Sequence, residues 1–362
     1  MNVLITHPDF EDLGGVARHY SKLKDKFRIP VTHFIIGKRA DAKGGIFSQL
    51  FRLFGDYLRF VKALRSGNYD VVHTNPSFDF KAFMRDGAFV LLGRLFKKQT
   101  VVFFHGWQKS FEQTIHRHGL WLFRLLFGKA NILIVSGEEF KKVFESWGVK
   151  QKIYCDTMTV DDAILKDFDI QETLTKRQES KKWRILFLAR LVREKGLYET
   201  IEAFSLLQNK YPMLELIIAG DGEELQNAEA LVTKRAIANV TFTGYVVGQA
   251  KTEIFKSAHI CCFPTYHGEG LATTICESMA FGLPVVTRPV GGVADFFIDK
   301  EHGFATNSTE PEVIAELIEK LLDDRELYRH ISLNNYNFAQ ENFLASSAAM
   351  RLEKIYESAL KN

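Results

Sequence analysis

The sequence predicts an α/β protein with two doubly wound domains, and three observations support this prediction. Short β-branched runs alternate with longer amphipathic stretches, the pattern of strand–helix units on parallel sheets. These units form two series, separated by a polar, charge-mixed stretch at residues 161–182 that we interpret as a linker. The length of 362 residues suits two domains at about 150 residues each. We therefore expect domains at residues 1–165 and 180–344, with ligands at the carboxyl ends of the strands in a cleft between them.

The apolar runs place the strands in order. The first series is expected at 2–6, 31–36, 70–74, 100–104 and 132–136. The second is expected at 184–188, 215–219, 240–243, 260–263 and 284–287. Helical patterns separate these runs, and helical segments close the chain from about residue 311 to residue 361.

The composition is that of an ordinary globular protein, with 46% hydrophobic and 25% charged residues. No apolar run approaches the roughly 18 residues of a membrane-spanning helix. The first ten residues, MNVLITHPDF, lack a basic segment and a long apolar segment, so we interpret them as a strand rather than a signal peptide. The four cysteines, at 155, 261, 262 and 276, fit neither a disulfide framework nor a zinc site. We expect a cytoplasmic protein.

Charge is distributed unevenly between the two halves. Residues 1–160 carry 25 Lys and Arg against 14 Asp and Glu, a net +11, whereas the remaining residues carry 22 against 30, a net −8. The sequence has no nucleic-acid-binding motif, so we expect no nucleic-acid partner. Segments 46–66 and 116–130 combine basic and aromatic residues in helical patterns, which is typical of helices at anionic membrane surfaces. Simple packing of these helices on the sheet stays open as the alternative.

The most informative segment is FPTYHGEGLATTICESMAFGLPVV, residues 263–286. A strand ends at Phe263, a glycine-rich loop holds Glu269, and a helix is expected to begin near Leu271 with Glu277 about two turns in. A helix N-terminus offers unpaired N–H groups and a partial positive charge, so it favours a phosphate. Carboxylates on either side of that phosphate could accept hydrogen bonds from sugar hydroxyls.

A second informative segment is RILFLARLVREKGLYETIEAF, residues 184–204. Arg190 and Lys195 follow a strand and precede a helix, where cations can neutralise a diphosphate. Taken singly, each is more often a surface residue.

Together these segments resemble the family-4 glycosyltransferases of the GT-B fold. The resemblance covers nearly the whole chain and is densest over residues 184–304. The Glu-x7-Glu spacing of Glu269 and Glu277 looks like the family's signature, as do the RLVREKG loop, LIIAGDG at 216–222 and VTFTGYV at 240–246. In the first half, Gly14-Gly15 and His105 stand where the family places a glycine loop and an active-site histidine. The resemblance implies two Rossmann-like domains facing a central cleft, with the C-terminal helix at 345–362 packed on the first domain.

The resemblance also implies roles for individual residues. The residues expected to act in catalysis are His105, Glu269, Arg190 and Lys195. Those expected to bind the donor are Gly14, Gly15, Arg190, Lys195, Gly244, Tyr245, Val246, Glu269, Gly270, Leu271, Ala272 and Glu277. No metal ligand and no cofactor are expected, because the cations would take the place of a metal at the diphosphate.

The expected function is retaining transfer of a hexose from a UDP- or GDP-sugar to a glycan or lipid-linked acceptor, in polysaccharide or glycolipid synthesis. Segments 46–66 and 116–130 would place the protein on the inner face of the membrane. Three alternatives remain open: a non-catalytic sugar-nucleotide-binding subunit, a nucleotide-sugar epimerase of the same fold, and an oxidoreductase. The last would need G-x-G-x-x-G directly after the first strand, where the chain has HPDFEDLGGVARH.

Overall fold

The computed structural model describes residues 1–12, 14–37, 46–156, 159–266 and 272–361. The chain divides into two compact units. Unit 1 comprises Met1–Thr159 and Ala345–Asn362, and unit 2 comprises Val160–Leu344.

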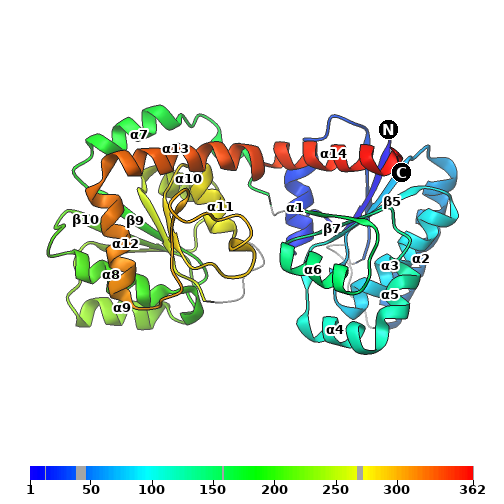
Figure 1. Ribbon diagram of the computed structural model, residues 1–362, viewed down its shortest axis with the longest axis horizontal. Helices are drawn as coiled ribbons and strands as arrows, with labels where there is room; N and C mark the ends of the chain where they lie inside the picture. Colours follow the sequence, from blue (N-terminus) through cyan, green and yellow to red (C-terminus); the bar gives the residue numbers. More distant parts are fainter. Residues whose placement is uncertain (13, 38–45, 157–158, 267–271, 362) are drawn as a thin grey trace. The chain divides into compact units, whose positions relative to one another are not determined.

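Unit 1 is built on a parallel sheet with the strand order β2-β1-β3-β5-β7-β8 (Figure 1). Its strands are β1 (Val3–His7), β2 (Val31–Ile35), β3 (Val71–Thr74), β5 (Gln99–Phe104), β7 (Ile132–Val135) and β8 (Lys152–Cys155), and β4 (Ser77–Phe78) pairs with β6 (Gly106–Trp107). Its helices are α1 (Gly15–Leu23), α2 (Ile46–Ser66), α3 (Phe80–Leu95), α4 (Lys109–Thr114), a π-helical turn (Ile115–Gly119), α5 (Leu120–Leu126), α6 (Glu138–Ser146) and α14 (Ala345–Lys361).

The two faces of this sheet have different cores because successive strand residues point to opposite sides. Val3, Ile5, Val101 and Phe103 pack with α1 and with Ala348, Leu352 and Tyr356 of α14. Val102 and Phe104 pack on the other face with a cluster of phenylalanines from α3, α5 and α6. The C-terminal helix is thus part of the core of unit 1.

Unit 2 repeats the architecture with the strand order β11-β10-β9-β12-β13-β14 (Figure 1). Its strands are β9 (Trp183–Leu188), β10 (Leu214–Ala219), β11 (Val240–Gly244), β12 (Ile260–Phe263), β13 (Val285–Thr287) and β14 (Gly303–Ala305). Its helices are α7 (Ile170–Glu179), α8 (Leu197–Leu207), α9 (Leu225–Lys234), α10 (Gly248–Ser257), α11 (Thr273–Ala280), α12 (Pro311–Asp323) and α13 (Arg325–Asn342), with short 3₁₀ turns at Asp162–Leu165, Arg193–Lys195 and Gly291–Val293. Helix α8 packs against α12, and α11 packs against α13.

The ten strands predicted from apolar runs are confirmed to within one residue at each end. Two edge strands were not predicted, β8 (KIYC) and β14 (GFA). The first is largely exposed and the second is very short, so neither forms an apolar run that composition would detect.

The interpretation of residues 161–182 as a linker is wrong. This segment belongs to unit 2 and contains α7, whose Ile170 and Leu174 are buried. Arg177 is also buried, and its guanidinium donates to the backbone oxygens of Phe281 and Phe255, at 3.1 Å each, where α11 and α10 end. Composition alone does not distinguish a buried arginine that binds carbonyl oxygens from an exposed one. The polar composition of this segment therefore wrongly suggested a linker.

Candidate functional site

Unit 2 contains a cavity of about 510 Å³ at the carboxyl ends of its central strands. It is lined by Ala189, Arg190, Val192, Glu194, Lys195, Glu223, Phe263, Ala272, Thr273 and Thr274. Strand β9 lies between β10 and β12, and the chain leaves β9 to one side through β10 and returns to the other side at β12. The cavity therefore lies at the topological switch point, where doubly wound sheets bind their ligands.

Backbone hydrogen bonds hold the loop that carries Arg190. The N–H of Leu191 donates to the carbonyl of Asp221 at 2.9 Å, and the N–H of Glu224 donates to the carbonyl of Leu191 at 3.0 Å. At Gly220 φ is +146°, and a Cβ would lie 1.8 Å from the carbonyl oxygen of Ala189. The glycine of the LIIAGDG motif thus allows the turn after β10 to pack directly against the loop after β9.

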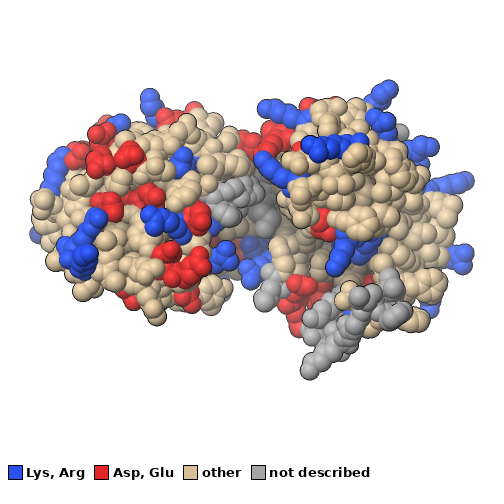
Figure 2. Space-filling view, turned by 90° about the horizontal axis from the view of Figure 1, so that it is seen from below, with Lys and Arg blue, Asp and Glu red and all other residues tan. Residues whose placement is uncertain are grey.

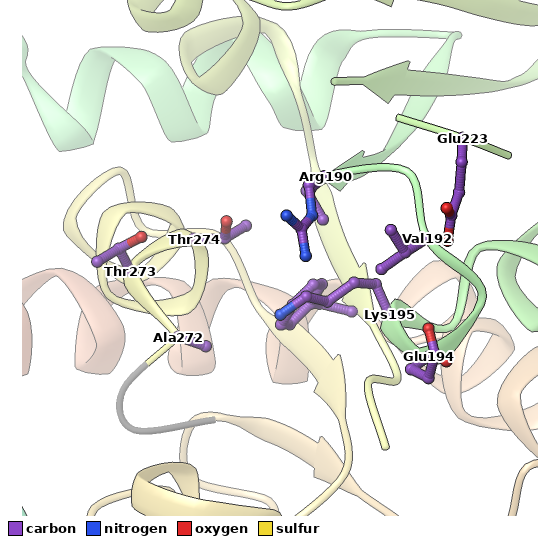
Figure 3. A pocket seen from close by; sticks show the side chains of 10 residues that line it. Arg190, Val192, Glu194, Lys195, Glu223, Ala272, Thr273 and Thr274 are labelled. Carbon is purple, nitrogen blue, oxygen red and sulfur yellow. The ribbon is translucent and has the colours of Figure 1, made fainter. Parts of the chain in front are cut away.

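Arg190 and Lys195 extend into the same space from this loop, towards the first turn of α11 (Figure 3). The Lys195 ammonium lies 5.9 Å from the centre of the Phe263 ring, at the end of β12. Arg190 is exposed, and its guanidinium has no hydrogen bond or carboxylate partner among the described residues. Glu194 and Glu223 also line the cavity, on the side away from α11 (Figure 3). Beside α11 the two cations favour an anionic ligand.

Helix α11 directs its N-terminus at the same cavity. The Thr274 hydroxyl donates to the carbonyl of Leu188 at 2.9 Å and so attaches this helix end to β9. Ala272 is the residue before the first turn, and Thr274 lies on the side of α11 nearest to Arg190, with Thr273 farther from it (Figure 3). The first N–H groups of a helix have no intrahelical acceptor, so they add to the positive potential made by the cations. The predicted residues Glu269, Gly270 and Leu271 lie outside the described residues.

The structure places Glu277 in the second turn of α11, half-buried. Its Oε2 lies 2.6 Å from Nζ of Lys251 on α10. Sequence reasoning missed Lys251, and no motif marks it. This ion pair holds the carboxylate against α10, and neither Glu277 nor Lys251 is among the residues that line the cavity.

Gly244 ends β11, and Tyr245 and Val246 follow it, next to the glycine turn after β10. The N–H of Gly220 donates to the carbonyl of Gly244 at 2.9 Å. Tyr245 is 72% exposed, and φ of Gly244 is +69°. These three residues are also absent from the cavity lining in the described part of the chain. Thr273, Thr274 and Val192 line the cavity and were not predicted. The two threonines could have been found from their position at the start of a helix after a glycine-rich loop.

Unit 1 holds the other three predicted residues, at the carboxyl ends of its own strands. Gly14 precedes α1 and Gly15 begins it. His105 follows β5 and is half-buried, with its ring stacked on Phe103 at 3.7 Å between centroids. Burial, together with the nearby His19 and His73, holds the pKa of His105 well below its ordinary value, so the ring is neutral.

Residues 169–338 match the family described as glycosyl transferases group 1. An uncharacterized glycosyltransferase of Methanocaldococcus jannaschii is 28% identical over 183 residues, 50% of this chain and 47% of that protein. The capsular polysaccharide biosynthesis glycosyltransferase CapM of Staphylococcus aureus is 26% identical over 187 residues, 48% of this chain and 46% of that protein. The chain thus spans about half the length of these curated relatives. The crystal structure of Anabaena HepE in complex with UDP and glucose matches with a TM-score of 0.67 and 18% identity, covering 99% of this chain and all of that one.

Residues 169–338 of unit 2 are thus similar to group 1 glycosyltransferases, and the predicted α/β fold of the GT-B type, with two doubly wound Rossmann-like domains, is confirmed.

Proposed function

We propose that this protein is a retaining glycosyltransferase that uses a nucleoside-diphosphate sugar as donor. The observation that carries the proposal is the cavity of unit 2, where Arg190, Lys195 and the N-terminus of α11 converge. HepE, which shares the fold, was crystallised with UDP and glucose. A diphosphate matches this cluster of positive charge, and Glu277 would hold the ribose hydroxyls beside it.

In the proposed reaction the bond between the sugar C1 and the diphosphate oxygen breaks while a bond from C1 to the acceptor oxygen forms on the same face. The acceptor's proton passes to the departing phosphate oxygen, so no protein group has to take it. Arg190 and Lys195 stabilise the negative charge that develops on the diphosphate. With these cations in place, the transfer is expected to proceed without a divalent metal. Glu269 is proposed to contact the donor sugar, and His105 is proposed to take part in catalysis.

The acceptor is proposed to be a glycan or a lipid-linked sugar. CapM acts in capsular polysaccharide biosynthesis, which supports an acceptor of this class. Assays should therefore include both a soluble oligosaccharide and a polyprenyl-linked one.

Thermal stability in the presence of UDP, GDP, ADP and CDP, with EDTA throughout, tests the donor site. A ligand at 100 times its Kd stabilises by about 2.7 kcal/mol, which a melting curve detects. We expect one nucleotide to raise the Tm, and Glu277→Gln to remove the increase. Glu253→Gln is the matched control, because Glu253 is an exposed acid on α10 whose partner is Lys256. No increase with any nucleotide, or an increase only without EDTA, would contradict the proposal.

We also propose that unit 1 contacts an anionic membrane surface. Phe51, Phe54 and Leu58 recur on one face of α2 and are exposed, Phe51 by 78%, and α5 adds Trp121 and Leu125. In Figure 2 Lys and Arg side chains lie along much of the outer margin of the uncharged surface of unit 1, with a few Asp and Glu at its inner side. Exposed aromatic residues flanked by cations suit the interface of an anionic bilayer, where each basic residue adds about 1 kcal/mol. None of the helices in the described parts of the chain has the length and apolar character to cross a bilayer.

Vesicle co-sedimentation tests this contact. The protein should bind phosphatidylglycerol vesicles more than phosphatidylcholine vesicles, and Phe51→Ser with Phe54→Ser should reduce binding at least about tenfold, the equivalent of 1.4 kcal/mol. The matched control changes two exposed apolar residues of unit 2, Leu206→Ser with Met213→Ser. Equal binding by both double variants would remove α2 from this role.

A further inference from the structure

Asn75 is the first residue after β3 and lies buried between His105 and Tyr20. Its Nδ2 donates to the backbone carbonyl of Thr6 at 2.9 Å. This bond fixes the orientation of the amide, because a carbonyl oxygen accepts and only the NH₂ group can donate to it. The Oδ1 of Asn75 is therefore the atom that faces the other two groups.

Two groups donate to that oxygen. The Tyr20 hydroxyl lies 2.8 Å from Oδ1 of Asn75, and Nε2 of His105 lies 2.9 Å from the same atom. Because Oδ1 only accepts, Nε2 of His105 must carry a proton. In a neutral imidazole the second nitrogen then has none, so Nδ1 of His105 presents a lone pair.

The rest of the network agrees with this polarity. Since the Tyr20 hydroxyl donates to Asn75, its oxygen is left to accept from Nε2 of His73, 3.5 Å away. Nδ1 of His73 then accepts from the hydroxyl of Tyr356 at 2.6 Å, which α14 supplies. Every group in the chain from Tyr356 to Asn75 has one consistent role.

The groups that face His105 all favour a neutral ring. His19 and Tyr20 lie on α1, and the centroid of the His19 ring is 5.0 Å from that of His105. His73 lies on β3 and further disfavours a positive charge at His105. The positive charges of Lys22 and of Arg351, which pairs with Asp156, further disfavour a charge on His19.

We propose that Asn75 is a positioning residue that holds His105 in the neutral Nε2–H tautomer, so that Nδ1 accepts a hydrogen bond from a hydroxyl of the bound sugar. Nδ1 of His105 has no hydrogen bond to any residue in the described part of the chain, and the side chain is half-exposed. His105 then acts as an acceptor, neither as an acid nor as a cation. This proposal rests on the proposed function, because the sugar is a substrate of the proposed transfer.

Nitrogen NMR of the full chain labelled with ¹⁵N-histidine tests the tautomer directly, with the His105 signals assigned from a His105→Gln spectrum. In the wild type near neutral pH, His105 should show a protonated Nε2 and an unprotonated Nδ1. A protonated Nδ1 would overturn the proposal without any variant or substrate.

Asn75→Asp tests the cause. A carboxylate at this position accepts the same bonds but stabilises the imidazolium, so the protonation midpoint of His105 should rise by about one to three pH units. The matched control is Asn335→Asp in unit 2, where Oδ1 of Asn335 lies 2.9 Å from Nδ1 of the buried His302 and its Nδ2 likewise donates to backbone carbonyls. That variant carries a similar folding cost but should leave the midpoint of His105 unchanged. An unchanged midpoint in Asn75→Asp would overturn the proposal.

UDP-glucose and GDP-mannose, as probes, separate this inference from the proposed function. With a probe that raises the Tm, the Nδ1 signal of His105 should move in the direction of an accepted hydrogen bond while Nε2 stays protonated. If the Tm rises and Nδ1 does not move, the acceptor role fails and the donor site stands. If neither sugar nucleotide nor the free nucleotides raise the Tm, the proposed function fails, and with it the acceptor role.

Discussion

The two units have the same topology at their switch points, yet they build opposite surfaces there. In unit 2 the loop after β9 carries two cations beside a helix N-terminus in a cavity of about 510 Å³. In unit 1 the strands at the switch point, β1 and β3, end among His7, His73 and Asn75, all buried. The edge of unit 2 thus presents two cations to a cavity, whereas the edge of unit 1 is made of buried, uncharged side chains.

The difference shows what the fold determines and what it leaves to the loops. A doubly wound sheet determines where a ligand binds, and the residues after each strand determine which chemistry is bound. A cationic edge suits a diphosphate, whereas a neutral edge with fixed hydrogen-bond polarity suits hydroxyl groups. The predictions below test this contrast, from the largest expected effect to the smallest.

Acid should destabilise unit 1 more than unit 2. Burial lowers the pKa of His7 to about 4 and the pKa values of His19 and His73 to about 3, against 6.5 in the unfolded chain. The unfolded state therefore takes up protons first as the pH falls below 6.5, and stability is lost from there down to the folded pKa values. Over this pH range each histidine lowers the free energy of unfolding by about 1.4 kcal/mol per pH unit, so the three together lower it by about 4 kcal/mol per pH unit. Among the described residues of unit 2, only His259 has a pKa lowered to such a value, about 3.

Hydrogen exchange near pH 7 and near pH 5 measures this loss separately for the amides of each unit. His19→Asn should make unit 1 less sensitive to acid by about 1.4 kcal/mol per pH unit, whereas His118→Asn, at an exposed position, should change nothing. Equal loss of protection in both units would contradict the contrast.

Gly220→Ala should disrupt the cationic edge of unit 2. A Cβ 1.8 Å from the Ala189 oxygen forces apart the two loops that position Arg190, at a cost of about 3 kcal/mol. Gly248→Ala is the control, since φ there is +57° but nothing lies within 4 Å of the added carbon, so only backbone strain of about 1 kcal/mol remains. Urea unfolding measures the free energy of unfolding of both variants. Similar losses of stability in the two would show that the contact between the loops is not the cause.

Lys195→Ala should lower turnover about 100-fold, the effect of losing one group that stabilises transition-state charge. The free energy of unfolding should change little, because Lys195 is only half-buried. Lys234→Ala, a surface lysine in the last turn of α9, is the control for charge alone. Unchanged turnover would remove Lys195 from the reaction and leave the cavity a simple binding site.

The sequence indicated the loops around the cavity of unit 2 but not the buried hydrogen-bond network of unit 1, for a physical reason. The LIIAGDG and RLVREKG segments are visible in the sequence because the close backbone packing between them requires particular residue types at neighbouring positions. Asn75, by contrast, acts through contacts with Thr6, Tyr20 and His105, which are distant in the sequence. Lys251 and Arg177 were missed for the same reason, since only the folded chain shows their partners. The core strands were predictable because burial on both faces imposes long apolar runs.

Gly14→Ala gives the smallest expected change in stability and sharpens the contrast most. Unlike Gly220, Gly14 has an ordinary extended backbone with φ −68°, and an added Cβ would meet only Oδ1 of Asp12 at 3.4 Å. The hydrogen bond from its N–H to that oxygen, 2.9 Å long, survives the change. The free energy of unfolding should therefore stay within about 0.5 kcal/mol of the wild type.

Because the fold does not need a glycine at this position, any loss of donor affinity in Gly14→Ala would arise from the ligand itself. We expect affinity for the stabilising nucleotide sugar to fall at least about tenfold, or 1.4 kcal/mol, because Gly14 and Gly15 are predicted to bind the donor. Calorimetric titration of the variant against wild type measures this. Undiminished affinity would assign phosphate binding to unit 2 alone and leave unit 1 with the neutral contacts of its histidine edge.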